Sequence, residues 1–275
     1  MKNILKSLFI SGFPVLALII FIKTIISTNF NLNDVSILLS SLTIVLFFSM
    51  LFIKPVARTT KTLLPYSILI LVSFFLGLFD FNSATLLLNF VLAFGWLAYL
   101  KWYSTFNHRI TTILEIGKKL PNFTLEKSNK EAINIHSLNG DYKIFLFYRG
   151  NWCPLCMAQI KEVVSEYKEL EKRNIDMVLV SSQPHKFTEN LAKKHKVPFH
   201  FLVDVDNKMA KQLDIFHENG LPTGFQALGY NSDVIMPTVI ITDKNNNIIF
   251  TDLTDNYRVR PEPNTFLKII DKHKG

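Results

Sequence analysis

The sequence predicts an all-α transmembrane region followed by an α/β domain, in which helices flank a central mixed sheet. Three observations lead to this prediction. Of the 275 residues, 49% are hydrophobic, and the mean hydropathy of +0.23 is high for a soluble protein. Residues 1–110 hold only 8 of the 30 Lys and Arg and 2 of the 22 Asp and Glu. From about residue 117 onward, strand-like and helix-like segments alternate.

Four apolar stretches make up the predicted transmembrane region, which we place at residues 1–110. They cover residues 4–26, 35–53, 63–78 and 84–100. A helix needs about 17–25 residues to cross a hydrocarbon layer of about 30 Å. The third and fourth stretches are short enough to form a re-entrant pair or a buried hairpin instead. The first could be a signal peptide, but its apolar run is too long and no small-residue cleavage pattern follows, so we expect a retained anchor.

Basic residues predict the orientation of these helices. They lie before the first stretch, between the second and third, and after the fourth: Lys2, Lys6, Lys54, Arg58, Lys61, Lys101 and Arg109. The loops at residues 31–34 and 80–83 hold acidic residues and no basic ones. Because Lys and Arg collect on the cytoplasmic side, both chain ends should face the cytoplasm at a plasma (inner) membrane. The net charge of +8 therefore reflects contact with a lipid bilayer and argues against nucleic acid as a partner.

Aromatic residues gather where the fourth stretch ends. They are Trp96, Tyr99, Trp102 and Tyr103. Such residues fit an aromatic belt at the membrane surface, or they pack on the domain that follows.

The rest of the chain, residues 117–275, is predicted to form one α/β domain. Strands are expected at residues 122–125, 133–135, 143–148, 177–181, 199–203, 238–242 and 248–251. Helices are expected at residues 153–172, 184–195 and 207–213, and from residue 263 onward. A turn of three asparagines, residues 245–247, joins the last two strands. Mixed βαβ units followed by a hairpin and a helix are typical of a layered α/β domain.

The only two cysteines, Cys153 and Cys156, lie between a predicted strand and a predicted helix. Two cysteines so close together cannot form the disulfide framework of a secreted scaffold, so they are a candidate reactive site. Pro154 suits the first position of the helix. A thiol at a helix N-terminus, or beside a cation such as Arg149, has its pKa lowered from about 8.5 toward about 3.5–7.5. Cys156 follows within the first turn, so the two sulfurs can close and reopen a disulfide.

Three other roles are conceivable for the pair: a zinc site, haem attachment and an inert pair in the core. A structural zinc ion would need further ligands, and His195 and His200 lie too far along the chain for a zinc finger. Haem attachment would require histidine at position 157, where the chain has Met157. An inert pair is disfavoured, because Cys-x-x-Cys between a strand and a helix is a redox signature. We therefore expect no metal and no other cofactor.

Residues 147–156, with the sequence Phe-Tyr-Arg-Gly-Asn-Trp-Cys-Pro-Leu-Cys, resemble the active-site stretch of peroxiredoxin-like proteins. These proteins form the alkyl hydroperoxide reductase and thiol-specific antioxidant group of the thioredoxin superfamily. Residues 120–125, 236–241 and 255–263 agree with the same group, in the same order. The resemblance covers residue 117 to the end and implies a thioredoxin-like fold. It also implies an antioxidant enzyme that reduces peroxide and is recharged by a thiol reductant such as thioredoxin or glutathione.

The sequence departs from the usual peroxiredoxin pattern at two places. The pattern Pro-x-x-x-Thr-x-x-Cys, laid over Cys156, places Arg149 at the proline and Cys153 at the threonine. The arginine usual on a later strand is replaced by Pro237, which resembles the cis-proline beside the reactive pair of thioredoxins. We therefore predict a cis peptide bond between Met236 and Pro237.

In the expected mechanism, the Cys153 thiolate attacks a peroxide oxygen or a disulfide sulfur, and Cys156 resolves the product. If the peroxiredoxin pattern aligned on Cys156 applies, the two cysteines exchange roles and Cys156 reacts with the peroxide. Arg149 would favour the thiolate, or it is simply an exposed residue of a turn. Trp152 would form a platform beside the thiolate, or it packs in the core. A protein disulfide is the other substrate considered, which would make the chain a thioredoxin-like disulfide reductase. The intact cysteine pair argues against a membrane scaffold with an inactive fold.

Overall fold

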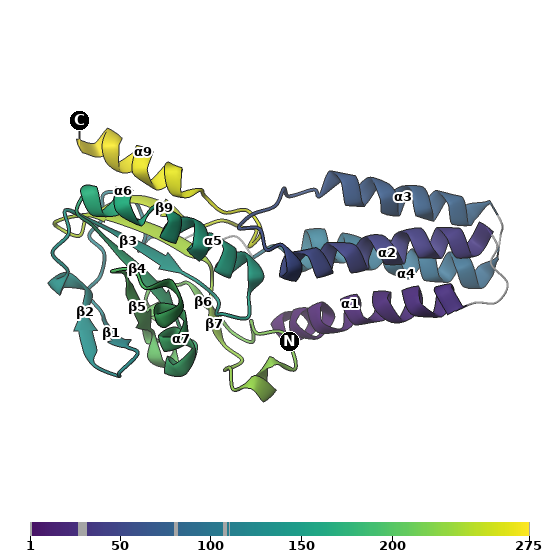
Figure 1. Cartoon of the computed structure of the whole chain (residues 1–275), viewed down its shortest axis with the longest axis horizontal. Coiled ribbons are helices and arrows are strands. Elements are labelled where there is room, and N and C mark those ends of the chain that lie inside the picture. The colour runs from purple at the N-terminus through teal and green to yellow at the C-terminus, as the bar shows by residue number, and fades with distance from the viewer. Residues whose placement is uncertain (1, 27–31, 80–81, 107–108, 110, 275) are drawn as a thin grey trace. The chain divides into compact units, whose positions relative to one another are not determined.

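The computed structural model divides the chain into two compact units (Figure 1). It describes residues 2–26, 32–79, 82–106, 109 and 111–274. The first, which we call the helical unit, contains Met1–Pro55 and Thr59–Phe106. The second, the α/β unit, contains Asn107–Gly275 together with Val56–Arg58 from the connection between two helices of the first. Part of each predicted acidic loop, at residue 31 and residues 80–81, lies outside the described residues.

The helical unit contains four long helices, which overlap the four apolar stretches of the sequence. They are α1 (Lys2–Ile26), α2 (Leu32–Ile53), α3 (Leu64–Leu78) and α4 (Ser83–Ala98), and a π-helical turn (Tyr99–Tyr103) extends α4. Within the described part of the chain, three helices are long and apolar enough to cross a membrane: Lys2–Ile26, Asp34–Ile53 and Ser83–Tyr103. The 15 residues of α3 rise about 22 Å, which is less than a typical hydrocarbon layer.

A buried polar cluster ties three of these helices together. The Asn89 side chain of α4 donates to Ser36 Oγ of α2 at 2.9 Å and accepts from Ser40 of α2 and Ser73 of α3, both at 3.2 Å. Gly77 allows this approach, since a Cβ there would lie 2.5 Å from the Asn89 amide nitrogen. Such hydrogen bonds between helices hold apolar helices in register, because dispersion between aliphatic side chains has little directional preference.

The aromatic residues near the end of α4 belong to the packing of the helical unit. Trp96 is buried and donates its indole N–H to Ser67 Oγ at 3.0 Å. The rings of Trp96 and Tyr99 meet the ring of Phe47 edge-on, with centroids 5.2 and 5.5 Å apart. Trp96 and Tyr99 therefore pack against other aromatic rings within the bundle, in place of the predicted aromatic belt at the membrane surface.

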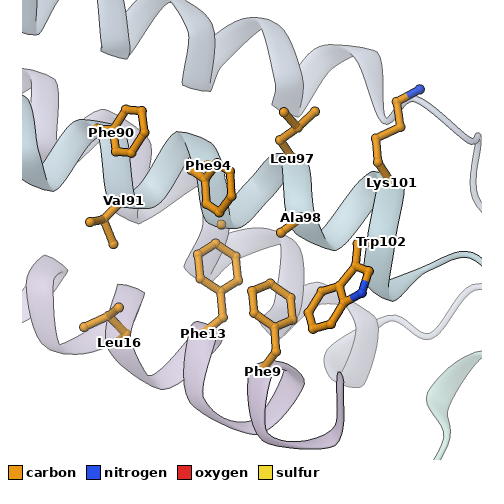
Figure 2. Close-up of a pocket in the computed structure, with 11 residues that line it drawn as sticks. Phe9, Phe13, Leu16, Phe90, Val91, Phe94, Leu97, Ala98, Lys101 and Trp102 are labelled. Carbon is orange, nitrogen blue, oxygen red and sulfur yellow. The ribbon is translucent and has the colours of Figure 1, made fainter. Parts of the chain in front are cut away.

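An apolar groove of about 610 Å³ lies between α1 and α4 (Figure 2). Figure 2 shows Phe9, Phe13 and Leu16 of α1 facing Phe90 and Phe94 of α4. Nearly the whole lining is apolar, as expected of helix surfaces that meet lipid tails.

The α/β unit is built on a seven-stranded mixed sheet with the order β2-β1-β5-β4-β3-β8-β9. Strands β3, β4 and β5 are parallel to one another, and the outer strands are antiparallel to their neighbours. The strands are β1 (Thr124–Lys127), β2 (Ala132–Asn134), β3 (Tyr142–Phe147), β4 (Ile175–Ser181), β5 (His200–Val203), β8 (Thr238–Asp243) and β9 (Ile248–Asp252). This arrangement confirms the predicted α/β class with a central mixed sheet.

Strand β3 lies at the centre of the unit, and all six of its residues are buried. Phe145 and Phe147 point into a core that also contains Val178 and Ile240 from the strands on either side. The amine of Lys143 is paired inside the protein with Asn246 Oδ1 at 2.9 Å. A central strand buried along its whole length gives the segment that follows it a rigid starting point.

The helices of the unit are α5 (Pro154–Ser165), α6 (Tyr167–Lys172), α7 (His185–His195), α8 (Lys208–Gln212) and α9 (Pro263–Lys274). The sequence predicted one helix over residues 153–172, but the chain leaves helical geometry at Glu166 (φ −94°, ψ 9°). A second, two-stranded sheet of β6 (Phe216–His217) and β7 (Val234–Ile235) was not predicted, because strands of two residues show no periodicity.

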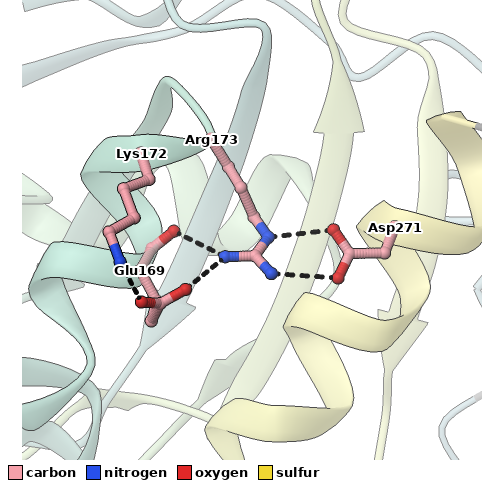
Figure 3. Close-up of polar contacts among 4 residues, drawn as sticks. All are labelled: Glu169, Lys172, Arg173 and Asp271. Carbon is pink, nitrogen blue, oxygen red and sulfur yellow. Dashed lines mark hydrogen bonds and ion pairs between the residues drawn. The ribbon is translucent and has the colours of Figure 1, made fainter.

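Helices α6 and α9 are joined by an ion-pair network (Figure 3). Arg173 follows α6 and donates two hydrogen bonds to the carboxylate of Asp271 on α9, at 2.9 and 3.1 Å. It also donates to Glu169, which in turn pairs with Lys172. The network lies at the surface, so we expect its net contribution to stability to be small, on the order of 1 kcal/mol or less.

Candidate active site

The two cysteines lie where the chain passes from β3 into α5. Cys153 is the residue before the helix, with extended geometry (φ −90°, ψ 108°), Pro154 occupies the first turn, and Cys156 follows on the same turn. Proline fits this position because its missing N–H would have no partner in the first turn of a helix. Both thiols are free and buried, and Cys153 donates a hydrogen bond to the Cys156 sulfur.

A buried glutamine holds the loop that carries the pair. Gln183, which follows β4, accepts a hydrogen bond from the Asn151 backbone N–H at 2.8 Å. The two N–H groups of its amide are shared among Tyr148 Oη, Asn151 Oδ1 and Thr188 Oγ1, which lie 3.1 to 3.2 Å from the nitrogen. Two of these contacts are buried and two are partly buried, and an unpaired amide would be costly there, so they restrict the conformation of the loop.

The nearest cation to the sulfurs is Arg260, from the segment between β9 and α9. Its Nη2 and Nη1 lie 3.4 and 3.5 Å from Cys156 Sγ, and Nη2 lies 4.0 Å from Cys153 Sγ. The same guanidinium donates to Gln159 Oε1 of α5 at 3.0 Å and to the Tyr257 carbonyl at 2.9 Å. Arg260 is 4% exposed, so its charge acts on the sulfurs with little screening by water.

The electrostatic environment separates the two thiols. Burial by itself raises the pKa of Cys156, but the hydrogen bond from Cys153, the charge of Arg260 and the Arg149 backbone N–H outweigh it and hold that pKa well below its ordinary value. Burial, followed by the hydrogen bond to Cys156 and its charge, raises the pKa of Cys153 well above the ordinary value. Both directions favour a negative charge on Cys156, the sulfur that lies nearer to the Arg260 guanidinium.

The charge balance around Arg260 leads to the same assignment. Among the residues that the structure describes, no carboxylate forms an ion pair with its guanidinium. Burial acts to lower the pKa of Arg260, but the charges of Cys156 and Cys153, together with the hydrogen bond to Cys156, outweigh it and raise that pKa. A buried cation without a counterion is strongly unfavourable, so the thiolate of Cys156 and the guanidinium of Arg260 stabilise each other.

The predicted supporting residues, Arg149 and Trp152, lie beside the pair and contact each other. The Arg149 guanidinium donates to the Gly220 carbonyl and lies 4.6 Å from the centre of the Trp152 ring. Its backbone N–H, rather than its side chain, meets Cys156. Trp152 in turn packs against Phe225, with ring centroids 5.9 Å apart. Both residues shape the wall of the site.

The prediction of a cis bond before Pro237 is wrong, because the Met236–Pro237 peptide is trans. Trans is the lower-energy isomer even before proline, by about 0.5–1 kcal/mol, and the extended entry into β8 accommodates it. The Pro237 carbonyl accepts from Arg109 Nη1 at 2.9 Å, and Arg109 Nη2 donates to Thr238 Oγ1 at 2.6 Å. Burial lowers the pKa of Arg109 to about 10. The Pro237 carbonyl thus holds the half-buried Arg109, which the sequence alone connects only with membrane orientation.

Arg260 and Gln183 were not identified from the sequence. Arg260 lies in residues 255–263, a stretch that resembles the family but to which no role was assigned. Gln183 belongs to no motif, and its role depends on contacts made after folding. Within the described ranges, no group of three or more His, Cys, Asp or Glu side chains could hold a metal ion.

A Cys-x-x-Cys pair at the N-terminus of a helix, directly after the central strand of this mixed sheet, is the arrangement of a thioredoxin-like fold with a candidate redox site. Residues 116–251 match the sequence profile of the AhpC/TSA family. This match agrees with the resemblance to peroxiredoxin-like proteins that the sequence motifs indicated.

Individual relatives include both a disulfide and a peroxide enzyme. The thiol-disulfide oxidoreductase ResA of Bacillus subtilis is 30% identical over 110 residues, which are 40% of this chain and 59% of that protein. The peroxiredoxin Bcp of the same organism is 24% identical over 103 residues, which are 38% of this chain and 66% of that protein. The chain thus spans less than two thirds of the length of either relative. The solved structure of Mycobacterium tuberculosis AhpC, 18% identical, covers 59% of this chain and 94% of its own, with a TM-score of 0.48.

Proposed function

We propose that this protein is a membrane-anchored thiol peroxidase in which Cys156 reacts with the peroxide and Cys153 resolves the product. The observation that carries the proposal is the buried Arg260 guanidinium, 3.4 Å from Cys156 Sγ and 4.0 Å from Cys153 Sγ. A thiolate held by a buried cation is available as a nucleophile at neutral pH. This assignment follows the peroxiredoxin overlay and reverses the order of attack that the helix position of Cys153 favoured.

The proposed reaction proceeds in three steps. The Cys156 thiolate attacks the terminal OH oxygen of a hydroperoxide, and the O–O bond breaks. The sulfur becomes a sulfenic acid. The alkoxide or hydroxide leaves and takes up a proton. The Cys153 thiol then attacks the sulfenic sulfur, which forms the Cys153–Cys156 disulfide and releases water. A thiol reductant, either one dithiol such as thioredoxin or two molecules of glutathione, reduces the disulfide and is itself oxidised to a disulfide.

A disulfide reductase is the second candidate. The similarity to ResA favours it, as does the position of the pair at the start of α5. In that reaction a thiolate attacks a disulfide sulfur of another protein and passes through a mixed disulfide. The burial of both thiols argues for the smaller substrate, since a protein disulfide needs direct access to the attacking sulfur.

The two candidates are separated by measuring both activities on the full-length protein in detergent. With thioredoxin and its reductase as the electron source, we expect steady consumption of hydrogen peroxide. In a separate assay with dithiothreitol as the only reductant, we expect little reduction of insulin disulfides above the slow chemical rate. A variant that lacks both cysteines provides the background rate. Rapid insulin reduction without peroxide turnover would establish the disulfide reductase and overturn the peroxidase assignment.

We further place the α/β unit on the cytoplasmic side of a plasma (inner) membrane. Lys54, Arg58 and Lys61 between α2 and α3, and Lys101 after α4, support this orientation. A reducing compartment would keep the pair ready to react with peroxide, whereas an oxidising one would hold it as a disulfide.

Protease accessibility tests this orientation. With an epitope at the C-terminus, we expect added protease to destroy the signal in inverted membrane vesicles and to leave it intact in right-side-out vesicles. Marker proteins of known orientation control for leakage. Digestion in right-side-out vesicles alone would place the α/β unit outside and exclude a cytoplasmic reductant.

A further inference from the structure

The α/β unit includes a short piece of chain from the connection between α2 and α3. Val56–Arg58 belongs to this unit, although the residues before and after it belong to the helical unit. Ala57 is buried, with 2% of its surface exposed. The segment is therefore part of the packing of the α/β unit.

Arg58 makes three polar contacts inside this unit. Its Nε donates to the backbone carbonyl of Arg260 at 3.1 Å. Its two terminal nitrogens form a bidentate pair with the Glu162 carboxylate of α5, with Nη1 at 3.3 Å from Oε1. Nη1 also lies 3.6 Å from Glu262 Oε1. The planar fork of arginine suits this bridging of a carboxylate and a carbonyl, and a lysine could not reproduce it.

These contacts join the two elements that carry the reactive ion pair. Helix α5 bears Cys156 and, six residues later, Glu162. The segment before α9 bears Arg260, whose carbonyl Arg58 holds and whose guanidinium meets the Cys156 sulfur. If this segment moved relative to α5, the distance between the Arg260 guanidinium and Cys156 Sγ would change. The interaction of two charges varies inversely with distance, so about one ångström of extra separation lowers the thiolate population on the order of fivefold.

We infer that Arg58 is a positioning residue, which holds Arg260 against Cys156 by clamping the Arg260 backbone to Glu162 of α5. The inference rests on the proposed role of the Cys156 thiolate. It makes the reactivity of the site depend on a residue of the α2–α3 connection, 98 residues before Cys156 in the sequence. A partly exposed ion pair contributes little to stability, so loss of Arg58 should alter the acidity of the thiol more than the stability of the fold.

The test is the pH dependence of alkylation in full-length Cys153→Ser protein, where Cys156 is the single thiol. Iodoacetamide reacts with the thiolate, so the midpoint of the rate against pH reports the acidity of Cys156. Adding Arg58→Ala should lower the alkylation rate at pH 6 by roughly three- to tenfold and move the midpoint upward. Arg58→Lys should restore little of this loss, because it cannot bridge both acceptors.

Arg173→Ala is the matched control. Arg173 is also partly exposed and also makes a bidentate pair with a carboxylate, that of Asp271 (Figure 3). It contacts neither α5 nor Arg260, so its loss should leave the alkylation profile unchanged, with circular dichroism confirming that both variants are folded.

Each outcome is decisive. An acidic Cys156 whose profile is the same in Arg58→Ala overturns the positioning role and leaves the proposed function intact. Equal shifts in Arg58→Ala and Arg173→Ala would mean a general loss of packing and would also overturn it. If Cys156 alkylates only at alkaline pH before Arg58 is changed, the proposed function itself fails.

Discussion

Replacing Cys156 by serine is expected to abolish peroxide reduction, whereas Cys153→Ser should leave a protein that reacts once and then stops. Serine at position 156 removes the sulfur that lies nearest the Arg260 guanidinium, and its hydroxyl is far too weak an acid to ionise there. Turnover should therefore fall on the order of 10³-fold or more, to the uncatalysed level. Stopped-flow consumption of hydrogen peroxide, with a single equivalent of protein, measures this loss.

The two variants also differ in the product they accumulate. Cys153→Ser should form a stable sulfenic acid that dimedone labels and mass spectrometry places at Cys156. Cys156→Ser should give no labelled sulfenic acid at either position. Labelling at Cys153 in the Cys156→Ser protein would show that the N-terminal cysteine reacts first and that the roles assigned here must be exchanged.

Replacing Arg260 by methionine should make the site inactive at neutral pH. Methionine has a similar volume but no charge, so the buried Cys156 thiolate would lose its counterion, and desolvation would then raise the thiol pKa. The thiolate fraction at pH 7 should fall on the order of 10²-fold. The absorbance of the thiolate at 240 nm, followed against pH in the Cys153→Ser background, measures the change.

The sign of the pH effect distinguishes Arg260→Met from the unaltered protein. Because its thiol pKa is lowered, the unaltered protein stays reactive as the pH falls below the ordinary thiol pKa, and reactivity is lost only as the pH passes through the lowered value. The variant should react only at alkaline pH. The free energy of unfolding should show the same pH dependence. A thiol pKa that is depressed in the folded state stabilises the reduced protein at pH values above the thiol pKa of the unfolded chain, about 8.5, and this contribution disappears on acidification.

The difference in unfolding free energy between the reduced protein and Arg260→Met should thus shrink as the pH is lowered. Arg260→Lys serves as the control, since it keeps the charge but loses the fork that reaches both Cys156 and Gln159, and an intermediate pH midpoint is expected. An unchanged midpoint in Arg260→Met would show that Arg260 has no part in ionising the thiol.

The reactive pair and its surroundings were predictable to different degrees. Cys153, Pro154 and Cys156 are adjacent in the chain, and their placement at the start of a helix follows from local rules for helix N-termini. The strands on either side of β3 were found within a few residues because long apolar runs are unambiguous. In contrast, the break at Glu166 and the trans geometry at Pro237 depend on neighbours that no local pattern describes.

The order of residues by itself establishes an apolar helical region, an α/β domain and a thiol pair at a helix N-terminus, because these depend on composition, periodicity and spacing within short segments. It does not reveal which sulfur carries the charge. The proposed charge on Cys156 depends on Arg260, more than a hundred residues further along the chain, and on the contacts that Gln183 and Arg58 make around the site. The ionisation of a buried thiol depends on the nearest charge in space, and only folding brings that charge to the sulfur.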